Sequence, residues 1–216
     1  MPGQFSAIHD EILTMRDDSP VSAAEQQTPQ IPNWSEREGR IPLIVGYTGH
    51  SKLPKGQFTS DKKSYLDILK SQVDEFFQKL KRDYPNTPLV VVGTLRGEAD
   101  DLIANVVLGQ KEKLPLILIL PADNREELLG SLTDEQRKSR IAILDQADQI
   151  IYQNCLESGE EVSPFTAVNA AIARYSQIIL ALRNGPSLTD AEFTDRAPPP
   201  AGSSEEVIRF QREGIG

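Results

Sequence analysis

Cysteine, histidine and tryptophan are scarce in this sequence, whose 216 residues include one cysteine, two histidines and one tryptophan. A disulfide needs two cysteines, so none can form within the chain, and a lone free thiol is typical of a reducing compartment. With so few histidines and cysteines, we expect no transition-metal site. Cys155 has no CxxC motif and no Cys/His cluster beside it. We therefore interpret Cys155 as an incidental loop residue and not as a nucleophile.

Long apolar runs and a surplus of basic charge are also missing. The longest apolar runs are short, such as residues 116–120, whereas about 20 residues are needed to span a bilayer. The N-terminus lacks the basic-then-apolar pattern of a signal peptide. We therefore expect a cytoplasmic protein with no membrane segment. The chain has 23 basic and 32 acidic side chains, which gives a net charge of −9. This charge disfavours a nucleic-acid partner because phosphates are bound through basic surfaces.

The composition predicts one globular domain preceded by an arm. Hydrophobic residues make up 38% of the chain and charged residues 25%, an ordinary balance for a protein with its own core. Residues 17–30 are rich in Ser, Gln, Pro and Asp, a composition that buries little surface. We therefore assign residues 1–40 to an N-terminal arm and linker, and residues 41–216 to a ligand-binding domain.

Within that domain, apolar runs of strand length alternate with helical patterns. Strands are predicted at residues 41–47, 89–92, 115–120, 149–152 and 177–182. Helices are predicted at residues 60–84, 98–108, 133–146 and 163–175, with a last helix after Ser203. Such alternation implies right-handed crossovers and parallel pairing. The predicted fold is a Rossmann-like three-layer α/β domain with a mostly parallel sheet of at least five strands.

In an open parallel sheet, ligands bind outside the carboxyl ends of the strands, so the loops there are the candidate site. The first loop carries Gly46, Thr48, Gly49, His50 and Ser51. Its glycines would let the backbone approach a ligand, and its hydroxyls and amides could donate to phosphate oxygens. A tight strand exit made of ordinary turn residues is the alternative. No carboxylate partner for His50 is visible, which favours a positioning role over catalysis.

The loop after the second strand holds six candidates, namely Gly93, Thr94, Arg96, Gly97, Glu98 and Asp100. It leads into a helix, whose first amides would be free to face a ligand. Arg96 could pair with a phosphate or carboxylate, while Glu98 and Asp100 could bind ribose hydroxyls. The alternative is that these acids only complement the dipole of the helix start.

Two later loops complete the set, with Asn184 and Gly185 after the fifth strand and Gly202, Ser203 and Ser204 before the last helix. The second of these loops could form an anion cradle, although a capping box of Ser203 with Glu206 explains the same residues. Walker A, HExxH, GxSxG and GxGxxG sequences do not occur.

These loops resemble the motifs of the SLOG superfamily, which includes Smf/DprA-like proteins, LOG enzymes and nucleotide-sensing domains. Residues 46–51 (GYTGHS) are similar to its G-x-T-G-H-R signature, and residues 94–102 (TLRGEADDL) to P-L-A-E-G-A-D-R-L. Residues 182–185 (LRNG) and 202–207 (GSSEEV) are similar to its W-D-G-like turn and G-G-T-x-x-V helix start. The resemblance spans residues 41–215, in order.

The resemblance implies a nucleotide-binding ligand sensor of bacterial antiviral defence or stress signalling. It implies an ADP-ribose-, NAD- or cyclic-nucleotide-like ligand and no required cofactor. We expect a homo-oligomer, with an effector domain or partner outside the chain. Departures from the motifs, such as Ser51 in place of arginine, alter the expected ligand contacts. Two alternatives remain: a nucleotide-processing hydrolase of N-glycosidase or phosphoribohydrolase type using Glu98 or Asp100, and a Smf/DprA-like binder of single-stranded DNA.

Overall fold

The computed structural model describes residues 40–53, 64–122, 128–129, 132–154, 163–182 and 199–214. Strands and helices alternate along the chain, as predicted. The strands are β1 (Leu43–Gly49), β2 (Leu89–Gly93), β3 (Leu116–Pro121), β4 (Gln149–Gln153) and β5 (Ile178–Leu182). The helices are α3 (Tyr65–Asp83), α4 (Glu98–Leu108), α6 (Asp134–Gln146), α7 (Pro164–Tyr175) and α9 (Ser204–Glu213).

The five strands form one parallel sheet in the order β4-β3-β2-β1-β5. The chain moves outward from β1 to β4 and then returns to place β5 on the other side of β1. This reversal is the topological switch point of a Rossmann-like α/β fold, where ligands commonly bind. The predicted fold class is confirmed.

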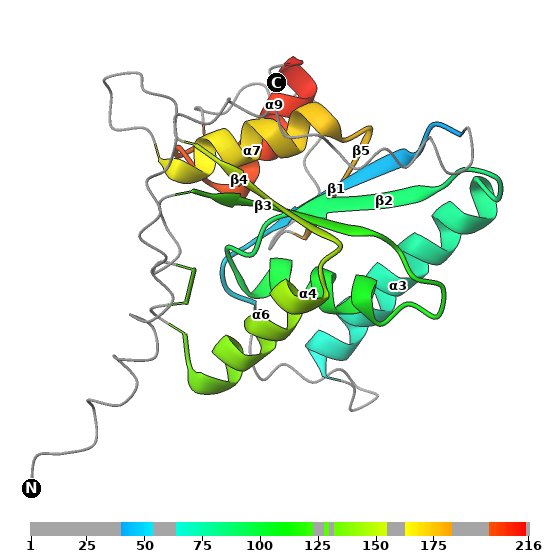
Figure 1. The fold of residues 1–216 in the computed structure, drawn as a ribbon, viewed down its shortest axis with the longest axis horizontal. Helices are drawn as coiled ribbons and strands as arrows, with labels where there is room; N and C mark the ends of the chain where they lie inside the picture. The colour runs from blue at the N-terminus through cyan, green and yellow to red at the C-terminus, as the bar shows by residue number, and fades with distance from the viewer. Residues whose placement is uncertain are drawn as a thin grey trace, which may run out of the picture. The chain divides into compact units, whose positions relative to one another are not determined.

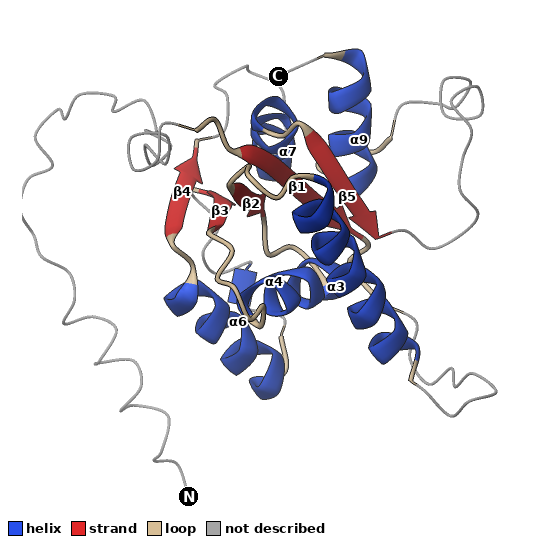
Figure 2. Ribbon diagram, turned by 90° about the vertical axis from the view of Figure 1, so that its right-hand side faces the viewer, coloured by secondary structure: helices blue, strands red, loops and turns tan. Residues whose placement is uncertain are grey.

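Helices cover both faces of the sheet (Figures 1 and 2). α3, α4 and α6 pack on one face, and α7 and α9 pack together on the other. The central strands are therefore buried on both sides, and every residue of β2 and β3 is buried. This explains why β3 reads as an unbroken apolar run.

Two of the predicted helix starts, those of α6 and α7, are confirmed, and a third, that of α3, lies at a different residue. Thr133 and Gln136 form the predicted capping box of α6, and Pro164 occupies the first turn of α7. The predicted start of the first helix at residue 60 lies outside the described residues. α3 instead begins after the N-cap Ser64, whose hydroxyl accepts from the amide of Leu66. Serine is a favoured N-cap residue, and both Ser60 and Ser64 fit that preference. The sequence alone therefore could not decide which of them caps the helix.

β1 is longer at its carboxyl end than the sequence predicts. It continues through Thr48 to Gly49, because β5 pairs with it as far as Gly49 opposite Leu182. Gly46, Thr48 and Gly49 therefore belong to a strand, and the first loop begins at His50. The partner strand supplies this extension, which the local sequence does not reveal.

The predicted arm, except Arg40, lies outside the described residues, as do Cys155, Asn184 and Gly185. Among the helices that the structure describes, none combines the length and apolar character needed to cross a bilayer.

Candidate functional site

The first two predicted loops are joined directly at the carboxyl ends of β1 and β2. The amide of Glu98 donates to the carbonyl of Ser51 at 3.0 Å, and the amide of Ala99 donates to that of His50 at 3.4 Å. The amide of Leu53 donates to the Glu98 carboxylate at 2.8 Å. The loop after β1 thus closes over the start of α4.

This junction corrects one expectation about α4. The sequence predicts helix-start amides free for a ligand, whereas the structure has them donating within the protein. The amides of Arg96 and Gly97 donate to Oδ2 of Asp100, and those of Glu98 and Ala99 donate to the first loop. These four amides at the start of α4 are therefore already engaged within the protein and are not free for a ligand.

Asp100 and Glu98, the two acids considered for ribose binding, accept hydrogen bonds from other groups of the protein. Asp100 is only 1% exposed and holds the turn at Arg96 and Gly97. Burial is the main cause that raises the pKa of Asp100 to about 7, and the two backbone hydrogen bonds oppose this rise. Glu98 accepts from the Leu53 amide and, at 3.4 Å, from the side-chain amide of Gln136. Their positions favour the structural alternative noted in the sequence.

The glycines of these loops are required by internal packing. A Cβ on Gly97 would collide with the backbone of Ser51, and one on Gly49 would collide with the Cβ of Ala99. Side chains on Gly46 and Gly93 would meet Ser176 and the ring of Tyr47, respectively. The sequence predicts that such glycines make room for a ligand, but in the structure they make room for neighbouring protein atoms.

The predicted loop before α9 lies against the end of β1 and the start of α7. The hydroxyl of Thr48 donates to the carbonyl of Ser204 at 3.3 Å. Gly202 has a φ of 74°, which favours glycine, and it sits beside the side chain of Ser163. Loops from opposite ends of the domain sequence therefore meet at the carboxyl ends of the strands. We call this end of the sheet its carboxyl edge.

The expected capping box of α9 takes another form. The side chain of the N-cap Ser203 makes no capping hydrogen bond. Glu206 reaches past it and accepts from the amide of Gly202 and the side-chain amide of Asn169, both at 2.9 Å. The same Asn169 amide also donates to the carbonyl of Ser203. Because Asn169 belongs to α7, the start of α9 is fixed by a neighbouring helix as well as by its own residues.

A pocket of about 230 Å³ opens between the second loop and the first turn of α7. Ser51, Leu95, Arg96, Leu128, Arg140, Ser163, Pro164 and Phe165 line it. The guanidinium of Arg96 lies 4.9 Å from the centre of the Phe165 ring, a cation–π distance. The pocket thus combines a cation, two serine residues and the positive end of the α7 dipole, features that suit an anionic group.

Ser51 and Arg96 are the predicted site residues that line this pocket. Thr48, His50, Ser203 and Ser204 lie at the same edge of the sheet but are not among the lining residues. The Nε2 of His50 and the hydroxyls of Thr94 and Ser203 are buried and have no hydrogen-bond partner among the described residues. Buried polar atoms usually have partners, so these three atoms retain capacity for further contacts.

Arg140 is one of the pocket residues that the sequence did not reveal. It is 3% exposed and makes a two-pronged ion pair with Asp101, at 3.0 Å and 2.8 Å, while its third nitrogen donates to the carbonyl of Leu128. A single arginine in a polar helix such as α6 carries no signal of burial. Ser163 and Phe165 were also missed as site residues, although the Ser163–Pro164 helix start was visible and follows a strand at the same edge.

Comparison with known proteins adds no assignment: the chain matches no family model and no curated protein. The structure by itself establishes a parallel five-stranded Rossmann-like α/β domain.

Proposed function

We propose that the carboxyl edge of the sheet binds a nucleotide-derived small molecule of the ADP-ribose, NAD or cyclic-nucleotide type, and that the protein acts as a sensor of it. The pocket around Arg96 carries this proposal, because it brings the Arg96 guanidinium to the N-terminal turn of α7. A phosphate placed there would contact a fixed cation and a helix start together.

The size of the pocket supports partial enclosure of such a ligand. Its volume of about 230 Å³ is below the roughly 300–1,000 Å³ of pockets that enclose whole drug-sized ligands. We infer that it takes the phosphate or phosphorylated sugar end. The rest of the ligand would extend along the edge towards Ser203, whose hydroxyl has no partner among the described residues.

Binding is favoured over turnover by the positions of the two acids. A hydrolase would need Glu98 or Asp100 at the ligand as a general acid or nucleophile, within hydrogen-bond reach of it. Asp100 is buried beneath the turn, and Glu98 is held by Leu53 and Gln136. Neither of them lines the pocket.

A ligand screen tests the proposal. The protein is heated with ADP-ribose, NAD, AMP and cyclic dinucleotides in turn, and a ligand bound to the native state raises Tm by mass action. Chromatography of the same mixtures detects products. A rise in Tm without products supports sensing. Release of a free base and ribose phosphate would establish the hydrolase instead, and no rise with any ligand would remove the proposal.

Arg96→Ala gives the matching test of the site. We expect ligand affinity to fall by about 10- to 100-fold, because a hydrogen bond to a charged group contributes about 1.5–3 kcal/mol. Arg174→Ala is the control, since Arg174 is an exposed arginine of α7 outside the pocket. Affinities are measured by calorimetry. Equal affinity of Arg96→Ala and the parent would place the ligand elsewhere.

A further inference from the structure

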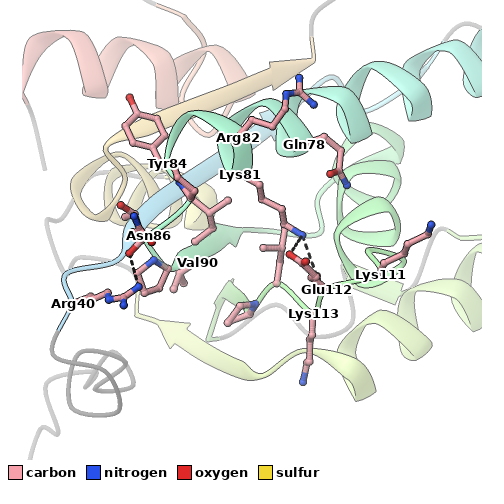
Figure 3. Close-up of a pocket in the computed structure, with 16 residues that line it drawn as sticks. Arg40, Gln78, Lys81, Arg82, Tyr84, Asn86, Val90, Lys111, Glu112 and Lys113 are labelled. Atoms are coloured by element: carbon pink, nitrogen blue, oxygen red, sulfur yellow. Dashed lines mark hydrogen bonds and ion pairs between the residues drawn. The ribbon is translucent and has the colours of Figure 1, made fainter.

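A second hollow lies at the opposite end of the sheet, at the amino-terminal ends of β2 and β3. Its volume is about 770 Å³, more than three times that of the pocket around Arg96. Five basic side chains line it: Arg40, Lys81, Arg82, Lys111 and Lys113. We call this hollow the basic cleft (Figure 3).

The basic cleft keeps a positive surplus after the carboxylates paired with its lining residues and the two nearby helix ends are counted. Lys81 pairs with Glu112 at 3.3 Å, and Lys113 pairs with Asp148 at 2.6 Å. The carbonyl ends of α3 and α4 also face this edge and contribute roughly half a negative charge each. Five cations against these groups leave a surplus of about two charges. Within the described part of the chain, neither Arg82 nor Lys111 pairs with a carboxylate.

This surplus matters for small anions in spite of the net charge of −9. Exposed charges are screened beyond about 8 Å at physiological salt, so an anion inside the cleft feels the lining residues and little of the remaining surface. Because the five cations gather in one hollow of about 770 Å³, the cleft suits a compact anion.

The cleft also offers apolar surface and an aromatic ring. Leu89, Val90 and Leu114 are buried in its wall, and Pro88 and Pro115 lie beside them. Tyr84, the residue that ends α3, is 46% exposed. Figure 3 shows the Lys81–Glu112 pair with Arg40, Tyr84 and Asn86 on one side, Lys111 on the other and Lys113 below.

We propose that the basic cleft is a second ligand site, which binds a nucleoside polyphosphate. The lysines and arginines contact the phosphates, and the base stacks on Tyr84 beside the apolar wall. The volume of the cleft falls within the range of pockets that enclose such ligands. This site is separate from the pocket around Arg96 and does not depend on the function proposed for that pocket.

Glu112 competes with the ligand for Lys81. Its side chain is 83% exposed, so it can turn into solvent when a phosphate takes its place. The Lys81 side chain is only 18% exposed and stays within the cleft. Removing the Glu112 charge should therefore strengthen binding, an effect opposite in sign to the loss of a basic residue.

The test is calorimetric titration of the full chain with ATP and with inorganic tripolyphosphate, in low salt and without magnesium. We expect Arg82→Gln/Lys111→Gln to weaken ATP binding at least tenfold. The matched control, Lys70→Gln/Lys138→Gln, removes the same charge from exposed positions outside the cleft and should stay within twofold of the parent. Glu112→Gln should bind both ligands several-fold more tightly.

Tyr84→Ala separates the base from the phosphates, because it should weaken ATP and leave tripolyphosphate unchanged. Tripolyphosphate binding as tight as ATP in the parent would overturn the role of the base. Absence of ATP binding, or equal binding by Arg82→Gln/Lys111→Gln and the parent, would overturn the site. Tighter binding of a short single-stranded oligonucleotide than of ATP would assign the cleft to nucleic acid. Loss of ATP binding in Arg96→Ala but not in Arg82→Gln/Lys111→Gln would move the nucleotide to the carboxyl edge.

Discussion

Asp100 shows how one buried side chain can order the turn beside the candidate pocket. Its carboxylate accepts from the amides of Arg96 and Gly97 and so fixes the turn that presents Arg96 to the pocket. Because the carboxylate is buried, its charge is costly, and its pKa rises to about 7. The carboxylate that orders the turn therefore also makes the stability of the fold depend on pH.

Asp100→Asn should change the dependence of stability on pH. The folded-state pKa of Asp100 lies above the unfolded value of about 3.9, so the native state binds the proton more tightly and the free energy of unfolding falls as pH rises from about 4 to 7. The expected contribution approaches about 1.4 kcal/mol per pH unit in the middle of that range. An asparagine keeps an acceptor oxygen for the turn but carries no charge.

Urea unfolding at several pH values between 4 and 8 measures this effect. The stability of the parent should fall relative to that of Asp100→Asn as pH rises, with the variant more stable at pH 8. Titrating groups distant from Asp100 are shared by both proteins and cancel in the difference, whereas the repulsion between Asp101 and Asp100 is removed with the Asp100 charge and forms part of it. Parallel stability curves would show that Asp100 titrates near its ordinary value in the folded protein.

At the level of helices and strands, the carboxyl edge is held together by contacts between elements that are distant in sequence. The loop after β1 is bonded to the start of α4, and Thr48 of β1 is bonded to the start of α9. Glycines stand where two elements approach too closely for a side chain. Gly49 is the clearest case, because β1 there faces Ala99 of α4 on one side and Leu182 of β5 on another.

Gly49→Val should therefore lower stability even with no ligand present. The new side chain would collide with Ala99 and the carbonyl of Leu182, and overpacking of this kind costs about 1–3 kcal/mol or more. Thermal unfolding of the ligand-free protein measures the change. Gly214→Ala is a useful comparison, since among the described residues no atom from a neighbouring element lies within 4 Å of a Cβ there, although its φ of 65° adds some backbone strain. An unchanged Tm in Gly49→Val, with ligand binding lost, would restore the view that Gly49 makes room for a ligand.

Across the whole molecule, the middle of the sheet is far better buried than its β4 edge. β2 and β3 each pair with two strands and are buried throughout. Among the described strands, β4 pairs with β3 alone, and its Tyr152 is half exposed. The burial therefore predicts a graded stability within one sheet.

Amide hydrogen exchange should follow this gradient. We expect the slowest exchange in β2 and β3, at a rate set by global unfolding, and faster exchange in β4, which can open locally. Exchange followed by NMR or mass spectrometry gives the comparison. Exchange in β4 as slow as in β3 would mean that the edge opens only with the whole domain, contrary to the expected gradient.

The layered α/β fold could be predicted from the sequence because its causes are local. Short apolar runs such as residues 116–120 can satisfy both faces of a buried strand, and cap residues such as Thr133 start a helix through their own hydrogen bonds. The general rule for parallel sheets then points to the edge where the loops gather. These inferences need no knowledge of which strand lies beside which.

The state of each candidate residue depended on partners far away in the chain. The sequence could not show that the α4 amides donate to residues 50 and 51, that Arg140 is buried against Asp101, or that Gly49 faces Ala99. It also could not show that basic residues from residue 40 to residue 113 gather at the opposite edge in a chain of negative net charge. Periodicity and capping describe neighbours within a few residues, whereas hydrogen-bond partners, burial and local charge are set by the packing of elements. The sequence thus determined the class of fold and predicted the end of the sheet at which a ligand would bind, and the tertiary structure decided how the groups at each end are engaged within the protein.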